Sequence, residues 1–449
     1  MKPLPDVPST HYGDSIQSTP RQRPGMRNQR FFYGWIILAM VPINLTLIYG
    51  IRHSFAVFYS SIIDEFSWSR GNIAVMFSLN LLFYGFSALL AGLLINRFNT
   101  SRVIYAGFTI LSLATACCGL TDKLWHFYVL FGFFVPLGTA LCGWPILWST
   151  LMNWFIERRG LVLGLAQIGG GLSFAYVIFA EWVISHVGWR WAYFILAGVL
   201  WVVLLPLVHL FFRYRPEEMN LKPYGFKVSL PIGDPLKETN AGKGFMGDPE
   251  KLREIFKIGK IWLLLASEAL YWGVGVYLVL AHQVKFAQDV GYSGAFSVFI
   301  FSLSGVAQIF GNVSGFVSDR VGRENAITLS TALCVAALLA LISVRGPSQS
   351  WLLYLYAICF GYGAGLFNPA MMAATADLFY GRHFGAVSGL FLTALGIGGA
   401  LGPWLGGYLH DLLGNYRIAF LLSSLCMSVG CILVWIAGPR KVASRRVTL

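Results

Sequence analysis

The sequence predicts an all-α membrane protein whose twelve transmembrane helices form two pseudo-symmetric halves of six. The first observation is composition: 56% of the 449 residues are hydrophobic and 12% are charged, whereas soluble domains carry about 25% charged residues. The second is glycine, which occurs 49 times and recurs inside apolar runs, as is typical of helices that pack closely in lipid. The alternating segments that build β-barrels are missing, so we expect helical spans.

Apolar stretches long enough to cross a bilayer occur twelve times in the sequence. A hydrocarbon core about 30 Å thick requires about 20 helical residues, and a polar connector separates the first six stretches from the last six. The longest stretches must tilt or protrude. The expected spans are residues 33–60, 72–95, 103–121, 125–151, 161–187, 190–212, 260–286, 294–316, 326–345, 351–376, 385–409 and 416–438.

Hydrophilic segments divide the chain into five expected parts. The connector contains too few apolar residues to bury a core of its own. The N-terminal tail lacks the short apolar stretch and cleavage site of a signal peptide, so the first span is expected to be permanent. The parts are a cytoplasmic tail (1–32), a first six-helix half (33–212), a cytoplasmic connector (213–259), a second six-helix half (260–438) and a cytoplasmic C-terminal tail (439–449).

The distribution of lysine and arginine predicts the orientation in the membrane. With the N-terminus inside, 26 of the 33 basic residues fall in internal segments and six fall in external loops. The positive-inside rule then places both termini in the cytoplasm. The formal charge of +13 is therefore expected beside anionic lipid and does not indicate nucleic-acid binding.

Three local patterns recur in both halves at almost the same offset. The segment Gly92–Arg97 after span two corresponds to Gly315–Arg320 after span eight. Glycines that open span five recur at the start of span eleven, and an aromatic-arginine segment before span six recurs before span twelve. Parallel repeats of this kind are related by an axis along the membrane normal, with a substrate site between them near the midplane.

The loop after span eight carries the pattern G-x-x-x-D-R-x-G-R, formed by Gly315, Asp319, Arg320, Gly322 and Arg323. This pattern resembles the signature of the major facilitator superfamily, whose members carry it between spans two and three and again between spans eight and nine. Other segments are similar to prokaryotic monocarboxylate-porter-like and oxalate/formate-antiporter-like carriers. These segments are Tyr33-Gly-Trp35, Gly50-Ile-Arg52, Phe66-Ser-Trp68-Ser-Arg70, Trp154-Phe155, Arg158-Arg159-Gly160, Arg215-Pro216-Glu217-Glu218 and Gly402-Pro403.

The resemblance implies the major facilitator fold, alternating access driven by a proton gradient, and a place in the prokaryotic inner membrane. The sequence departs from the pattern at two places. The first loop has Asn96 and Asn99 where the signature prefers an aspartate and a glycine, and span eight has Asn312 where monocarboxylate porters carry an arginine that contacts the substrate. The anion must therefore be bound by another cation. The implied gating residues are Arg97, Asp319, Arg320 and Arg323.

Arg52 is the candidate for that cation. It lies within span one, where a charged side chain costs about 2.5–3.5 kcal/mol and is retained where it meets water, a partner or a ligand. Helical spacing puts Asn44 on the stripe of Arg52 and Tyr49 one turn away, and the guanidinium offers a planar fork to a carboxylate. The alternative is a structural arginine that caps carbonyls or extends toward the outer surface.

Span seven is the repeat partner of span one, and its residues Glu268, Tyr271 and His282 fall on one helical stripe. A buried carboxyl and an imidazole can exchange a proton near neutral pH. We expect Glu268 and His282 to couple transport to protons, and Tyr271 and His282 to line the substrate site. The resemblance supports His282, because monocarboxylate-like carriers often have a histidine at this place. For Glu268 the alternative is a solvated carboxylate near the cytoplasmic end.

Aromatic and polar side chains of spans four and ten complete the expected substrate site. Cavities for organic ligands are mostly apolar with a few placed polar groups, although helix packing explains each of these side chains equally well. They are Trp144, Trp148, Tyr362 and Asn368.

The sequence favours a carrier over an enzyme. The glycine clusters at 169–171 and 396–399 lack the lysine of a phosphate-binding loop, and no catalytic or cofactor motif is found. All seven cysteines lie in apolar runs, so no disulfide framework and no metal site is expected.

The expected function is secondary active transport of small, monocarboxylate-like organic anions by a monomer. The expected partners are the anion, protons and membrane lipid. An exporter of amphipathic or drug-like compounds on the same fold is the first alternative, and a membrane sensor that binds without translocating is the second. Symport, exchange and uniport all stay open, because the same residues can serve each of them.

Overall fold

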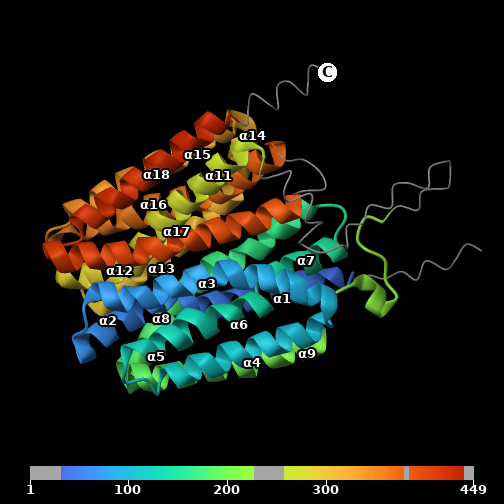
Figure 1. Cartoon of the computed structure of the whole chain (residues 1–449), viewed down its shortest axis with the longest axis horizontal. Coiled ribbons are helices and arrows are strands. Elements are labelled where there is room, and N and C mark those ends of the chain that lie inside the picture. Colours follow the sequence, from blue (N-terminus) through green and yellow to red (C-terminus); the bar gives the residue numbers. More distant parts are fainter. Residues whose placement is uncertain (1–31, 227–256, 379–383, 439–449) are drawn as a thin grey trace, which may run out of the picture.

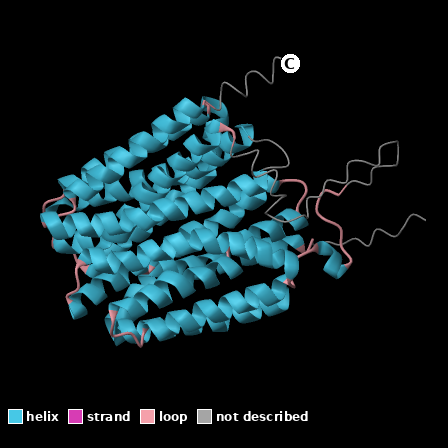
Figure 2. Ribbon diagram, in the orientation of Figure 1, coloured by secondary structure: helices cyan, strands magenta, loops and turns pink. Residues whose placement is uncertain are grey.

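The computed structural model describes residues 32–226, 257–378 and 384–438, and these ranges form a bundle of helices joined by short loops (Figure 2). The expected N-terminal tail up to residue 31, the C-terminal tail from residue 439 and residues 227–256 of the connector lie outside the described residues. Eleven helical stretches of the described chain are long and apolar enough to cross a membrane. Ten of them correspond to one predicted span each.

The longest stretch, residues 161–211, contains two predicted spans. Gly188 interrupts it with φ 80° and ψ 160°, a backbone conformation that glycine adopts without steric cost. The chain reverses there between spans five and six. The described residues therefore contain the twelve predicted crossings.

The first half is built from spans one to six. Span one is broken at Ser54, and span four contains a π-helical turn and a further break at Gly143. The helices are α1 (Gly34–His53), α2 (Phe55–Phe66), α3 (Arg70–Arg97), α4 (Thr100–Cys118), α5 (Leu124–Val129), η1 (Leu130–Phe134), α6 (Val135–Cys142), α7 (Trp144–Trp154), α8 (Arg159–Val199), η2 (Leu200–Leu204) and α9 (Leu205–Phe211).

The second half repeats this arrangement with spans seven to twelve. Its first span contains a π-helical segment, η4, between two α-helices. The elements are α11 (Gly259–Glu268), η4 (Ala269–Val276), α12 (Tyr277–Asp289), α13 (Gly294–Val313), η5 (Ser314–Phe316), α14 (Val317–Val321), α15 (Arg323–Ser343), η6 (Pro347–Gln349), α16 (Ser350–Leu378), α17 (Phe384–Leu413) and α18 (Arg417–Ala437).

The two halves lie side by side and meet along two pairs of helices (Figure 1). Helix α3 packs along α17, and α8 packs along α13. Glycine permits this approach: a Cβ added to Gly396 of α17 would lie 2.8 Å from the carbonyl oxygen of Leu81 in α3. Each contact joins the second or fifth span of one half to the fifth or second span of the other, as a parallel repeat requires.

The first residues of the connector fold back onto the first half. A short 3₁₀ helix, η3 (Pro216–Met219), follows span six. Trp154 at the end of α7 donates its indole N–H to the carbonyl of Arg213 at 2.9 Å, and the backbone N–H of Tyr224 donates to the carbonyl of Trp154 at 2.9 Å. Residues 213–226 are therefore fastened to the loop between spans four and five.

Candidate functional site

Arg52 lies near the end of α1 and is 2% exposed. Its guanidinium carbon lies 4.0 Å from the ring centre of Tyr84 in α3 and 5.3 Å from that of Tyr49. The Nε and Nη2 atoms have no hydrogen-bond partner among the described residues. Aromatic faces attract a cation, but they leave the N–H donors of Nε and Nη2 unsatisfied, so this guanidinium retains capacity to bind an oxygen acceptor.

Two tyrosines that the sequence analysis did not select surround Arg52. Tyr84 shares a hydrogen bond of 2.9 Å with Tyr49 between their hydroxyls. Tyr277, the first residue of α12, comes from the other half and interacts with the Arg52 side chain. Its ring lies 5.9 Å from that of Phe77 in α3. The sequence gives little indication that Tyr84 and Tyr277 lie beside Arg52, because a tyrosine in an apolar run can face lipid, a neighbouring helix or a ligand.

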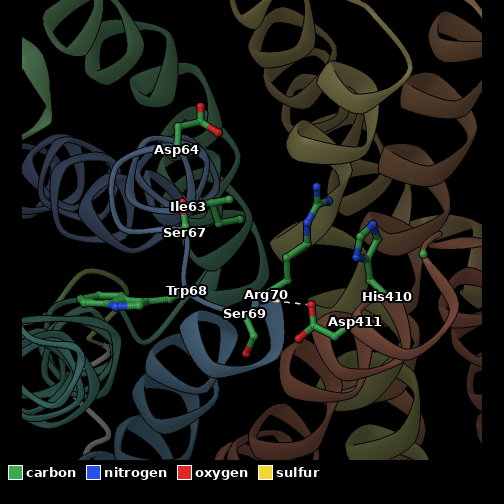
Figure 3. A pocket seen from close by; sticks show the side chains of 9 residues that line it. Ile63, Asp64, Ser67, Trp68, Ser69, Arg70, His410 and Asp411 are labelled. Carbon is green, nitrogen blue, oxygen red and sulfur yellow. Dashed lines mark hydrogen bonds between the residues drawn. The ribbon is translucent and has the colours of Figure 1, made fainter.

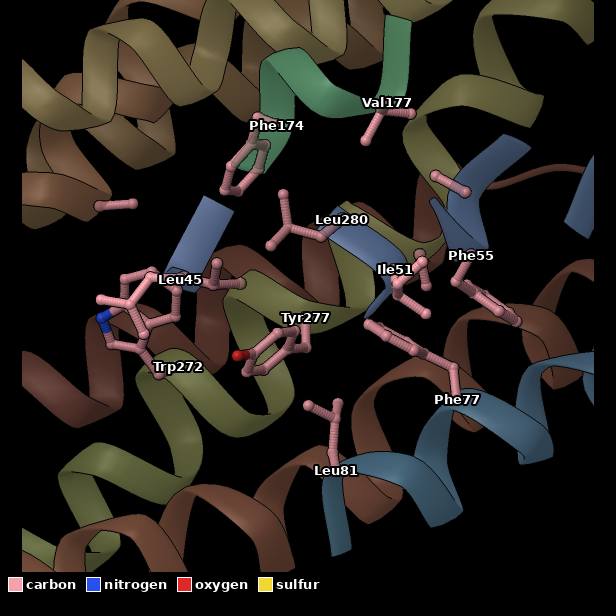
Figure 4. Packing of buried hydrophobic residues seen from close by; sticks show 14 of the residues in the cluster. Leu45, Ile51, Phe55, Phe77, Leu81, Phe174, Val177, Trp272, Tyr277 and Leu280 are labelled. Atoms are coloured by element: carbon pink, nitrogen blue, oxygen red, sulfur yellow. The ribbon is translucent and has the colours of Figure 1, made fainter. Parts of the chain in front are cut away.

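Arg52 therefore belongs to the seam between the two halves. Figure 4 shows Tyr277 beside Phe77 and Leu81 of α3, with Ile51 of α1 close by. Phe174 and Val177 of α8 border the same region (Figure 4). Apolar side chains exclude water from this seam, and an electrostatic contact made there is strengthened.

Asn44 and Glu268 are two further predicted polar residues that lie buried in the bundle. Asn44 is fully buried, and neither its Nδ2 nor its Oδ1 atom has a partner in the described ranges. Glu268 ends α11 and is 7% exposed. A buried amide without partners costs free energy unless a ligand or water completes it, so Asn44 keeps unused donor and acceptor groups inside the bundle.

His282 lies in α12, away from Arg52 and toward the far end of the bundle. It is fully buried, and its Nε2 lies 2.7 Å from the carbonyl oxygen of Pro403. Its ring centre lies 5.3 Å from that of Tyr59 and 5.1 Å from that of Tyr416. The carbonyl contact assigns a proton to Nε2.

Tyr271 faces a different neighbour from His282. Its hydroxyl shares a hydrogen bond of 2.7 Å with Ser330 of α15, and its ring stacks on Phe367 of α16 at 3.8 Å. The π-helical segment η4 occupies this part of span seven, and its wider turn changes the angle between successive side chains. Glu268, Tyr271 and His282 consequently do not share the stripe that a regular α-helix would give them.

The predicted residues of spans four and ten lie on α7 and α16. Trp144 and Trp148 are half-buried, with their rings edge to face at 5.1 Å. Tyr362 and Asn368 are also half-buried. Their part in a substrate site stays a prediction, because the contacts found around Arg52 come from other helices.

The predicted gating residues lie at the end of the bundle where α3 finishes and α15 begins. Arg97 ends α3 and Arg320 lies in α14, both exposed. Arg323 donates from Nη1 to the hydroxyl of Ser318 at 2.8 Å. Asp319 also belongs to α14, but its side chain lies outside the described part of the structure.

The opposite end, where α2 finishes and α3 begins, is called the distal end here. Polar contacts between the halves close it. Arg70 of α3 donates from Nη1 to Asp289 of α12, and Asp411 of α17 accepts the backbone N–H groups of Arg70 (3.1 Å) and Gly71 (2.7 Å). Lys285 of α12 lies 3.1 Å from Asp64 of α2. The sequence analysis missed this cluster, because its members belong to opposite halves and lie far apart in the chain.

The repeat explains the origin of one of these contacts. Glu65 and Asp289 stand at corresponding places at the ends of spans one and seven. Glu65 binds Arg190 and the indole N–H of Trp189 within its own half, whereas Asp289 binds Arg70 of the other half. The carboxylate at this position therefore contacts its own half in the case of Glu65 and the opposite half in the case of Asp289.

Comparison with known proteins agrees with this architecture. The family model of the Major Facilitator Superfamily matches residues 42–361 and 329–448. The chain belongs to this superfamily. It is 23% identical to monocarboxylate transporter 13 of Rattus norvegicus, covering 89% of this chain and 87% of that protein. It is 25% identical to monocarboxylate transporter 11 of Homo sapiens, covering 92% and 84%.

Two solved structures share the fold. A bacterial homologue of the human lysosomal transporter Spinster, in an inward-facing and unoccupied conformation, superposes with a TM-score of 0.69 at 18% identity, over 90% of this chain and 97% of that one. The nucleoside transporter NupG superposes with a TM-score of 0.67 at 14% identity, over 90% and 100%. The predicted helical membrane fold is confirmed, and the protein is a multi-pass membrane transporter.

Proposed function

We propose that the protein is a secondary active carrier of small, monocarboxylate-like organic anions that works by alternating access. One observation carries the proposal: a buried arginine at the seam of the two halves has unsatisfied N–H donors and aromatic neighbours but no carboxylate contact among the described residues. A buried cation without a counter-ion is costly, and an anionic substrate would supply the missing charge. The monocarboxylate transporters among its relatives favour the same substrate class.

The proposed coupling ion is the proton. Glu268 is the buried carboxyl of span seven and His282 the buried imidazole of the same span, and either group can take up and release a proton as its surroundings change between the two access states. The proposed location is the prokaryotic inner membrane, with both termini in the cytoplasm. The distribution of basic residues supports this orientation, and the distal end then faces the exterior.

The test is uptake into proteoliposomes of lactate, pyruvate, oxalate, formate and an aromatic acid, with and without an inward proton gradient. Arg52→Gln is expected to lower uptake about 100-fold or more, because a buried charge interaction loses one partner. Arg52→Lys keeps the charge but not the planar fork, so we expect partial activity. The matched control is Arg190→Gln, which removes an arginine paired within one half.

Three outcomes would contradict parts of the proposal. Normal uptake by Arg52→Gln would refute the role of the guanidinium. Uptake that is independent of the proton gradient would refute proton coupling but would not contradict anion transport. Competition by amphipathic drugs, without competition by any of the carboxylates, would favour the exporter alternative.

A further inference from the structure

Arg70 stands at the mouth of the distal end, on the same side of the seam as Arg52. It belongs to the first half, and its side chain is 17% exposed. The Tyr59 hydroxyl donates to the Arg70 carbonyl at 3.1 Å, and Tyr59 follows Arg52 along span one, closer to the distal end. A path that opens between the halves at this end would pass Arg70 before it reaches Arg52.

A pocket of about 530 Å³ lies open beside Arg70. Figure 3 shows the guanidinium extending between Asp64 on one side and His410 on the other, while Asp411 approaches the Arg70 backbone. Hydroxyl, charged and aromatic groups border the pocket, and Arg70 is one of its lining residues, so a solute that enters from this side reaches the arginine. The lining residues are Ile63, Asp64, Ser67, Trp68, Ser69, Arg70, His410, Asp411 and Gly414.

The carboxylates that contact Arg70 both come from the second half. Asp289 accepts from its guanidinium, and Asp411 accepts from its backbone N–H. Lys285, by contrast, contacts Asp289 of its own helix at 3.7 Å as well as Asp64. When the halves separate at the distal end, Lys285 therefore keeps a carboxylate partner, whereas Arg70 loses both of its own.

We propose that Arg70 is an outer recognition site for the carboxylate of the transported anion, masked in the closed state by Asp289. The anion replaces this protein carboxylate on the guanidinium, so binding and opening of the distal end assist each other. The planar fork of arginine suits the exchange, because a free carboxylate can accept the same N–H donors that Asp289 accepts. This inference rests on the proposed function, since it takes the substrate to be an organic anion.

The proposed exchange predicts that substitutions of Arg70 and of Asp289 change the affinity for the anion in opposite directions. Arg70→Gln removes the anion site, whereas Asp289→Asn removes the charged competitor for it and keeps an oxygen that can still accept an N–H group. If the contact served only to hold the distal end closed, both substitutions would weaken the same interaction and act in the same direction. The sign of the change therefore separates the two roles.

The experiment measures binding without transport. A cysteine at the pocket wall, Ser67→Cys, is labelled from the distal side with a membrane-impermeant maleimide while lactate or oxalate is added. Sodium chloride of equal ionic strength is the reference. Either anion is expected to slow labelling. Asp289→Asn should lower the half-protecting concentration, and Arg70→Gln should raise it about tenfold or more, the loss expected for a charge-assisted hydrogen bond.

The matched control is Glu65→Gln, because Glu65 pairs with Arg190 inside one half and its loss should leave protection unchanged. Arg70→Lys, which keeps the charge, should restore part of the protection and shows that the position tolerates substitution. Protection lost equally in Arg70→Gln and Asp289→Asn, or absent for both anions in the parent protein, would overturn the proposal. Neither result would alter the outcome for Arg52, whose test is uptake.

Discussion

In the proposed anion site, the aromatic rings around Arg52 determine how much of its charge a ligand can use. Tyr84 contributes both a ring face to the guanidinium and a hydroxyl to Tyr49. Tyr84→Phe removes the hydroxyl and keeps the face, whereas Tyr84→Leu removes both. We expect Tyr84→Leu to raise the KM for the transported anion between about 2-fold and 30-fold, the range of a cation–π contact. Uptake kinetics in proteoliposomes measure this change.

Tyr84→Phe is the control for that experiment, and a much smaller change is expected from it. A KM raised equally by both substitutions would show that the hydroxyl pair, and not the ring face, supports Arg52. The amount of tagged protein that is recovered from the membrane by solubilisation distinguishes either effect from misfolding.

Contacts of Arg52 within its own helix could be predicted, and contacts from other helices could not. The contact with Tyr49 follows from the short spacing of the two residues in one helix. The contacts that Tyr84 and Tyr277 make with Arg52 depend on how three helices pack, which periodicity does not specify. His282 was expected beside the substrate, but its orientation toward Pro403 depends on the close approach of α17, where a Cβ on Gly406 would lie 2.4 Å from the imidazole.

At the scale of elements, η4 is the segment that positions Glu268 and Tyr277. It packs against α17 so closely that a Cβ on Gly398 would lie 2.0 Å from the carbonyl oxygen of Ala269. Gly398→Ala therefore forces the backbones of α17 and η4 apart and is expected to destabilise the fold by about 1–3 kcal/mol. Thermal unfolding of the detergent-solubilised protein, followed by intrinsic fluorescence, measures the loss.

Gly198→Ala is the matched control in a helix of the first half. Nothing lies within 4 Å of the place where its Cβ would stand, and alanine is favoured over glycine inside a helix by about 0.5–1 kcal/mol. The melting temperature should therefore stay equal or rise. A melting temperature of Gly398→Ala that stays as high as that of Gly198→Ala would mean that η4 and α17 can separate at little cost.

The spans themselves could be predicted because hydropathy and length decide them. Their interruptions could not. Gly188 lies between the predicted spans 161–187 and 190–212, whereas the π-helical turns of η1 and η4 were not predicted. A single apolar sequence does not reveal where its turns widen, since no residue type specifies a π-helical turn.

At the scale of the whole molecule, the proposed alternating-access cycle includes a state in which the distal end is closed. Ser60 of α2 donates to the side-chain oxygen of Gln288 in α12 across the seam. In the double variant Ser60→Cys with Gln288→Cys, a short bifunctional thiol reagent is expected to join the halves and to reduce uptake to background. A reducing agent that cleaves the reagent should restore uptake.

The control pair is Tyr105→Cys with His209→Cys, since these side chains contact each other at 3.2 Å within the first half. Cross-linking there should leave uptake intact. Uptake that survives cross-linking of Ser60→Cys to Gln288→Cys would refute the need for this end to open. The parent protein, with its seven native cysteines, is treated with the reagent in parallel.

The existence of two related halves was visible in the sequence, but the closed end was not. Three repeated patterns at nearly one offset define the halves. Which end is closed depends on Arg70 meeting Asp289 and Asp411, whose positions follow from packing of spans two, seven and eleven. In the proposed alternating-access cycle these contacts break, so the sequence would encode two arrangements, and periodicity alone cannot choose between them.

The fastening of residues 213–226 to Trp154 bears on how the protein can be engineered. A fluorescent reporter inserted immediately after Phe212 would separate Trp154 from Arg213 and Tyr224, the residues that hold the end of α7. An insertion after residue 226 leaves that attachment in place. Split versions of the carrier, with each half expressed from its own gene, should therefore be divided after residue 226. Residues 213–226 then stay with the first half, to which they are hydrogen-bonded.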